Sequence, residues 1–203
     1  SDVNINANPE EVRKELQAQI DYARSLGINP SHIDSHMGAV AVNKDIWKVY
    51  IEVGHKNKLI SMAWKSRILN LFDENFPVPD YIVPANDIYM LYPEVDRSFI
   101  EDAAGEDVAN TLIVSDIYKY EDWYELYSNK IKSLQPGLNV FLLHLGYDNE
   151  ELKAVTIDHP EYGSLWRQLD FEVFNSKEIK QLIKDEEIKL VTWGEIRNVI
   201  YEK

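Results

Sequence analysis

Hydrophobic residues recur along the chain at two spacings, which predicts alternating helices and strands. Apolar positions three or four residues apart indicate helices over residues 8–27, 43–57, 120–134, 161–174, 175–187 and 192–203. Short apolar runs indicate strands over residues 31–36, 58–64, 138–146 and 188–193. Because the two kinds of element alternate, the pattern predicts an α/β fold with largely parallel strands.

Capping residues mark the ends of several of these helices. Asn8 can cap the first helix, Pro9 suits its first turn, and Gly27 can end it. Thr192 and Glu195 have the spacing of a capping box at the start of the closing helix. Residues 66–117 are less regular and proline-rich, and the pattern there predicts only a short strand around Tyr81 to Val83.

Composition narrows the range of partners. The 203 residues fit a single domain over 1–203, and their net charge is -14. An acidic chain offers no basic surface for phosphates, so nucleic acids and anionic membranes are poor candidate partners. No apolar run reaches the length of a membrane span, and the absence of cysteine leaves the cellular compartment open.

The stretch SHIDSHMGAV, residues 31–40, places two histidines and an aspartate close together. On a helix, His32 and His36 would share one face and could bind one metal ion. On a strand, His32, Asp34 and His36 would line one face, with the two imidazoles roughly 13 Å apart. The order of elements along the chain favours the strand.

Three candidate residues then fall at the carboxyl ends of predicted strands, namely His36, His144 and Trp193. In α/β barrels this edge of the sheet carries the active site, because the loops that follow several strands meet there. We expect His36 and His144 to lie within about 10 Å of each other if they serve one small site. The alternative is that each histidine is a hydrogen-bonded packing residue.

Two segments resemble a known family. PSHIDSHMG resembles the His-x-Asp-Ser-His signature of the YdjC-like carbohydrate deacetylases, the family of chitooligosaccharide deacetylase. The stretch from Leu142 to Ile196 is similar to the carboxyl-terminal portion of that family. The resemblance implies a (β/α) barrel that removes acetyl groups from N-acetylated sugars with a divalent metal, Mg²⁺ or Zn²⁺.

The same resemblance implies roles for individual residues. His36 corresponds to a metal ligand, and His144 to a general acid or a contact to the acetyl carbonyl. A metal can activate water for amide hydrolysis, and a protonated imidazole can supply the proton that the leaving amine needs. Asp34, His32 and Trp193 would then orient the site or contact the substrate, although Asp34 and His32 could instead fill a polar barrel interior.

The family's Asp-Asp strand and its Gly-x-His segment, which supply further ligands and the base, have no counterpart in these 203 residues. We therefore expect a partial barrel that alone binds metal weakly, releases no acetate and associates with itself through an uncovered sheet edge. The alternative function is a non-catalytic carbohydrate-binding or assembly module on the same fold. A different barrel hydrolase, such as a phosphodiesterase, lacks support because no phosphate-cradling glycine loop is evident.

Three further groups allow two interpretations each. Residues 148–151 could bind sugar hydroxyls or, as we favour, cap a helix. Trp166, Arg167 and Trp193 could form a sugar-stacking wall, although Trp166 is equally suited to the core. The aromatic residues of 120–127 suit either an interface or an ordinary buried helix face.

Overall fold

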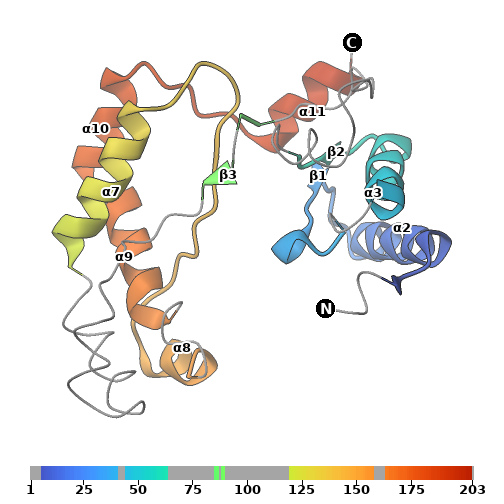
Figure 1. Ribbon diagram of the computed structural model, residues 1–203, viewed down its shortest axis with the longest axis horizontal. Coiled ribbons are helices and arrows are strands. Elements are labelled where there is room, and N and C mark those ends of the chain that lie inside the picture. The colour runs from blue at the N-terminus through green and yellow to red at the C-terminus, as the bar shows by residue number, and fades with distance from the viewer. Residues whose placement is uncertain are drawn as a thin grey trace. The chain divides into compact units, whose positions relative to one another are not determined.

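The computed structural model of the protein describes residues 6–40, 44–63, 85–86, 88–89, 119–157 and 163–202. The chain forms two compact units (Figure 1). Unit 1 comprises residues 1–88, 137–140 and 190–203, and unit 2 comprises residues 89–136 and 141–189. Across the described ranges, no helix has the length and apolar character needed to cross a membrane. The strand expected at Tyr81 to Val83 lies outside the described residues.

Unit 1 confirms the first part of the predicted order of elements. Helix α2 (Pro9–Ser25) precedes strand β1 (His32–Ile33), and helix α3 (Lys44–Lys56) precedes strand β2 (Ile60–Ser61). The two strands are parallel, with His32 opposite Ile60 and Ile33 opposite Ser61. β1, α3 and β2 therefore form the expected β-α-β arrangement, and α2 packs against α3 (Figure 1).

The ends of α2 follow from its sequence. The Asn8 side chain accepts hydrogen bonds from the backbone N–H groups of Glu10 and Glu11, at 2.9 and 3.3 Å. At the other end Gly27 adopts φ +80°, and the N–H of Ile28 donates to the carbonyl of Ala23 at 3.1 Å. This bond closes a Schellman motif, which requires a left-handed residue at the position of Gly27.

Helix α3 supplies most of the core of unit 1. Its inward face buries Ile46, Val49, Tyr50 and Val53, as the spacing predicts. Gly54 on the same face lies so close to β2 that an added Cβ would collide with the Ser61 hydroxyl. The close approach of α3 to the strand therefore depends on glycine at this position.

The last predicted strand is wrong. Residues 188–192 have no strand structure, and Trp193 is the first residue of helix α11 (Trp193–Tyr201) rather than the end of a strand. Both bonds of the Thr192–Glu195 capping box are present, so the local capping signal determined the structure at this point. α11 contacts β1 and β2.

Unit 2 is mainly helical. It contains α7 (Tyr120–Lys132), α8 (Glu150–Val155), α9 (Ser164–Asn175) and α10 (Lys177–Asp185), of which α7, α9 and α10 pack against one another (Figure 1). Their buried side chains form one hydrophobic cluster of Trp123, Tyr127, Ile131, Trp166, Leu169, Val173 and Ile179. The aromatic residues of 120–127 thus belong to a buried helix face. Asn149 caps α8 by accepting from the N–H of Leu152, which confirms the helix-cap interpretation of residues 148–151.

The predicted strand over 138–146 is much shorter than expected. β4 (Val140–Phe141) pairs with β3 (Ile88–Tyr89), and the residues after it continue without strand pairing. Phe141 to His144 are half-buried rather than buried on both faces. The apolar run indicated burial, but here its partners are helix side chains rather than neighbouring strands. The fold is mixed α/β, mostly helical, with two small two-stranded sheets among the described residues.

Candidate functional site

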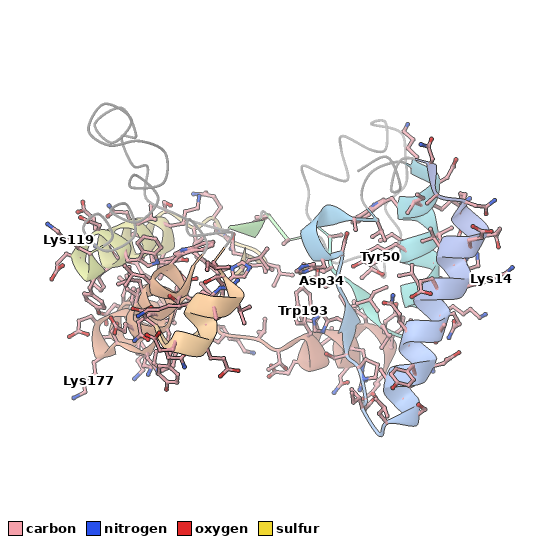
Figure 2. The ribbon with its side chains drawn as sticks, turned by 90° about the horizontal axis from the view of Figure 1, so that it is seen from below. Lys14, Asp34, Tyr50, Lys119, Lys177 and Trp193 are labelled. Carbon is pink, nitrogen blue, oxygen red and sulfur yellow. The ribbon has the colours of Figure 1, made fainter. Side chains whose placement is uncertain are left out.

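Unit 1 brings together two of the predicted substrate-binding residues. The rings of His32 on β1 and Trp193 on α11 stack, with centroids 5.1 Å apart and an interplanar angle of 20°. The Nδ1 atom of His32 lies 3.1 Å from the hydroxyl of Ser31. Figure 2 shows Asp34 and Trp193 beside β1, with Tyr50 reaching toward the strands from α3.

The surroundings of His32 favour its neutral form. Burial of the imidazole lowers its pKa, because the charged ring would lose hydration, while the nearby Asp34 carboxylate opposes this effect. Trp193 covers one face of the ring. His32 is therefore suited to packing and hydrogen bonding more than to carrying a charge near neutral pH.

The expectation of one strand from His32 to His36 is wrong. β1 ends at Ile33, and His36 begins the 3₁₀ helix η1 (His36–Gly38). The hydroxyl of the buried Ser35 accepts from the N–H of Val40 at 3.2 Å, and Gly38 adopts φ +69°. The hydrogen bond from Val40 to the serine hydroxyl and the left-handed glycine compete locally with strand geometry, and this short turn satisfies both.

Asp34 and His36 are both exposed to solvent. Both side chains are therefore accessible to a ligand, but no described contact fixes the imidazole of His36. The described ranges contain no group of three histidine, cysteine, aspartate or glutamate side chains that could hold a metal ion. The residues described thus do not by themselves fit a metal centre, which in catalytic zinc sites needs about three protein ligands.

Tyr50 holds the carboxyl ends of the two strands of unit 1 together. Its hydroxyl lies 2.7 Å from the carbonyl oxygen of Ile33 and 3.2 Å from that of Met62, so its proton can be shared between them. Burial of the phenol, and to a smaller extent the Asp34 carboxylate, raise the pKa of Tyr50 well above its usual range. The side chain therefore stays a neutral hydrogen-bond donor that fixes where the turn carrying His36 begins.

In unit 2, His144 lies three residues beyond β4 and is half-buried. Its backbone N–H donates to Oδ2 of Asp170 at 3.0 Å. Its ring packs against Trp166, with centroids 5.4 Å apart. Trp166 is only 2% exposed, so of the two interpretations that its sequence allowed, the structure supports a place in the core.

Asp170 is the residue that pattern reading missed. Its side chain is 0% exposed, and its Oδ1 accepts from Trp123 Nε1 at 2.9 Å and from the Tyr127 hydroxyl at 2.7 Å. Burial, followed by the Asp170 charge, raises the pKa of Tyr127 well above its usual range. The sequence did contain a sign of this role, because Asp170 falls on the apolar face of α9, four residues after Trp166. An aspartate is rarely buried at such a position unless its carboxylate has hydrogen-bond partners.

The segment from His144 to Asp148 is attached to α9 at alternate residues. Besides the bond to His144, the N–H of Gly146 donates to the carbonyl of Arg167 at 3.2 Å. The N–H of Asp148 donates to the Gln168 side chain at 3.0 Å. Helix α9 thus fixes the backbone of residues 144–148 along its length.

Comparison with known proteins places this mixed α/β chain, with its two histidine-bearing segments, in a family. The model for the YdjC-like protein family matches residues 2–185, and the chain belongs to that family. A carbohydrate deacetylase from Thermoanaerobacter pseudethanolicus (strain ATCC 33223 / 39E) is 24% identical over 189 residues. The match covers 93% of this chain and 61% of the relative, so the chain spans about three fifths of that protein's length. The family expected from the two sequence segments is therefore confirmed.

Proposed function

We propose that the protein acts in the hydrolytic removal of acetyl groups from N-acetylated sugars. The observation that carries this proposal is the match of residues 2–185 to the YdjC-like family, joined to a relative named as a carbohydrate deacetylase. The fold associated with this function is a (β/α) barrel. The parallel pair β1 and β2 with α3 between them supports it, because this is the repeating unit of such barrels.

In this proposal His144 is the general acid. Hydrolysis of an acetamide adds water to the carbonyl carbon and breaks the C–N bond, and the departing amine nitrogen takes up a proton. An imidazole can deliver that proton if its ring is held toward the leaving group. The hydrogen bond at its backbone and the contact with Trp166 support this role, because both restrict where the ring can lie.

We also propose that His36 is one ligand of a divalent cation, Mg²⁺ or Zn²⁺. The exposed position of its side chain supports access by an ion. The remaining ligands would have to come from outside the described residues, since those residues contain no group of three suitable side chains. Asp34, His32 and Trp193 would border the sugar.

The test is acetate release from a panel of N-acetylated mono- and disaccharides by the complete product of the gene, supplied with Mg²⁺ or Zn²⁺. His36→Ala should abolish metal binding measured by calorimetry, and acetate release with it. His144→Ala should leave metal binding intact and slow turnover by roughly 100-fold. His55→Ala is the matched control, because His55 lies in the last turn of α3 beside Tyr201 and has no place in the proposed site.

Absence of acetate release from every sugar tested would overturn the proposal. If sugars still bound under those conditions, the non-catalytic carbohydrate-binding module would take its place. Self-association of the 203-residue chain remains a separate prediction, which light scattering tests directly.

A further inference from the structure

Unit 2 contains a buried carboxylate whose second oxygen is directed at the backbone of His144. We propose that Asp170 is a positioning residue, which sets the place of the His144 imidazole by holding the backbone N–H from which that side chain extends. The inference deepens the proposed function and rests on it for the catalytic meaning of His144. The contact itself belongs wholly to unit 2.

A buried carboxylate needs hydrogen bonds that compensate for its lost hydration. Removing a charged aspartate from water is costly unless its oxygens accept hydrogen bonds. Asp170 is 0% exposed, and the described residues supply it with three donors: Trp123, Tyr127 and His144. Both oxygens of the carboxylate thus accept hydrogen bonds, and the donors come from separate parts of the chain.

The two oxygens of Asp170 accept hydrogen bonds from different parts of unit 2. Oδ1 accepts from Trp123 and Tyr127, both on α7, and so joins α7 to α9. Oδ2 accepts from the backbone N–H of His144 in the segment after β4. Because a carboxylate is rigid and planar, the bonds at Oδ1 determine where Oδ2 points, and therefore where the His144 backbone lies.

Helix α9 controls the ring of His144 as well as its backbone. Trp166 lies four residues before Asp170, on the same face of the helix, and its indole packs against the His144 imidazole. Trp166 in turn makes an edge-to-face contact with Trp123, at a centroid distance of 6.5 Å. Helix α9 therefore positions both the backbone and the ring of His144.

The neighbouring bonds extend this support without replacing it. Gly146 and Asp148 are attached to Arg167 and Gln168 of the same helix, whereas the intervening Leu145 and Tyr147 are 54% and 61% exposed. Without the bond at Asp170, the segment would still be attached at residues 146 and 148, but the backbone of His144 would lose its hydrogen bond to α9. A shift of about 1 Å in a group that acts on a substrate can reduce turnover by on the order of 100-fold.

The testing variant is Asp170→Asn, which retains the size of the side chain and one acceptor oxygen. If the amide oxygen stays with Trp123 and Tyr127, its NH₂ group faces the N–H of His144, and two donors cannot bond. The substitution therefore preserves the contact between α7 and α9 and breaks the one to His144. Tyr127→Phe is the matched control, since it removes one of the two donors at Oδ1, leaves the Trp123 bond to hold the carboxylate, and keeps Oδ2 as the acceptor for the His144 N–H.

The first readout requires no activity. The His144 ring protons lie against the Trp166 indole, so their NMR shifts report the position of the ring. Asp170→Asn should move these shifts, and Tyr127→Phe should leave the His144 shifts close to those of the unsubstituted chain. Unchanged His144 shifts in the Asp170→Asn variant would overturn the proposal.

The second readout is kinetic. In the complete gene product, Asp170→Asn should lower kcat by on the order of 10-fold to 100-fold with little change in KM. Tyr127→Phe should leave kcat within about 3-fold, the range expected of a group that does not set the geometry of the proton donor. An equal fall of kcat in both variants would show that Asp170 acts only through general stability, and would overturn the proposal.

The two readouts separate this inference from the proposed function. If the unsubstituted protein released no acetate but Asp170→Asn still moved the His144 shifts, the deacetylase proposal would fall and the structural contact would stand. If the Asp170→Asn variant did not fold, hydrogen exchange of the His144 amide in the unsubstituted chain would decide. Protection of that amide supports the bond to Asp170, and exchange at the rate of an unprotected amide overturns it.

Discussion

The two units hold their histidines in different ways. In unit 1, His36 stands in an exposed 3₁₀ turn, and the buried neighbours Ser35 and Tyr50 fix the backbone around it rather than its ring. In unit 2, the backbone of His144 is bonded to Asp170 and its ring is packed against Trp166. Among the described residues, both the backbone and the ring of His144 have contacts that position them, whereas the described contacts near His36 involve the backbone around it.

The largest expected effect tests the tryptophans that face the histidines. Trp166→Ala should lower the free energy of unfolding by about 3–5 kcal/mol, because it removes a nearly fully buried side chain from the core of unit 2. Trp193→Ala should cost about 1 kcal/mol, since that side chain is only half-buried. Urea denaturation followed by circular dichroism measures both values. Similar losses would contradict the view that Trp166 supports His144 more firmly than Trp193 supports His32.

A second comparison concerns the two buried tyrosine hydroxyls. Tyr127→Phe should cost about 2 kcal/mol, because it removes a hydrogen bond to the carboxylate of Asp170. Tyr50→Phe should cost about 1 kcal/mol, because its acceptors are the neutral carbonyls of Ile33 and Met62. Denaturation of the two variants under identical conditions gives the difference, and a larger loss for Tyr50→Phe would reverse the comparison.

Helix caps provide a smaller test. Thr192→Ala should cost about 1 kcal/mol, because it breaks the capping box at the start of α11 on which the placement of Trp193 depends. Ser176→Ala should cost about 0.5 kcal/mol, since Ser176 caps α10 by accepting one bond, from the N–H of Ile179. Thermal melting of both variants checks the order. The near-ultraviolet signal of Trp193 should change only in the Thr192→Ala variant.

The smallest effect is the pH dependence of unit 1. Burial lowers the pKa of His32 in the folded state, so the unfolded chain binds more protons just below the ordinary pKa of about 6.5. The contribution of neutral His32 is therefore fully present above that pH and is lost as the pH falls toward the folded pKa. His32→Gln should flatten this dependence in urea titrations at a series of pH values. An equal dependence in both proteins would contradict the assignment.

Local signals in the sequence predicted most of the helices. Apolar stripes and caps such as Asn8 and Thr192 act within one or two turns, and the structure follows them. Strands depend on partners distant in sequence, and there the prediction failed for residues 188–192 and for the length of the strand at Val140. An apolar run indicates burial, but it does not specify whether a strand or a helix provides the contact.

The sequence predicted the family more readily than the geometry around its histidines. The signature around His36 and the segment around His144 identified the family, and His32 and Trp193 do meet. The turn at His36 could not be predicted from alternation, because Ser35 and Gly38 determine it locally. Asp170 was missed since its role depends on donors up to 47 positions away in the chain.

Unit 1 is assembled from widely separated stretches of the chain, and this has a consequence for biosynthesis. Arg197 on α11 donates to the carbonyl of Pro30, a contact that spans 167 positions. Ribosomes add about 5–20 residues per second, so roughly 10–30 s separate the emergence of His32 from that of Trp193. During that interval β1 lacks the helix that later covers it, while α2 and α3 can already pair. The nascent protein therefore depends on α11 to cover a surface that β1 forms much earlier in synthesis, and the His32–Trp193 stack can form only once α11 has been made.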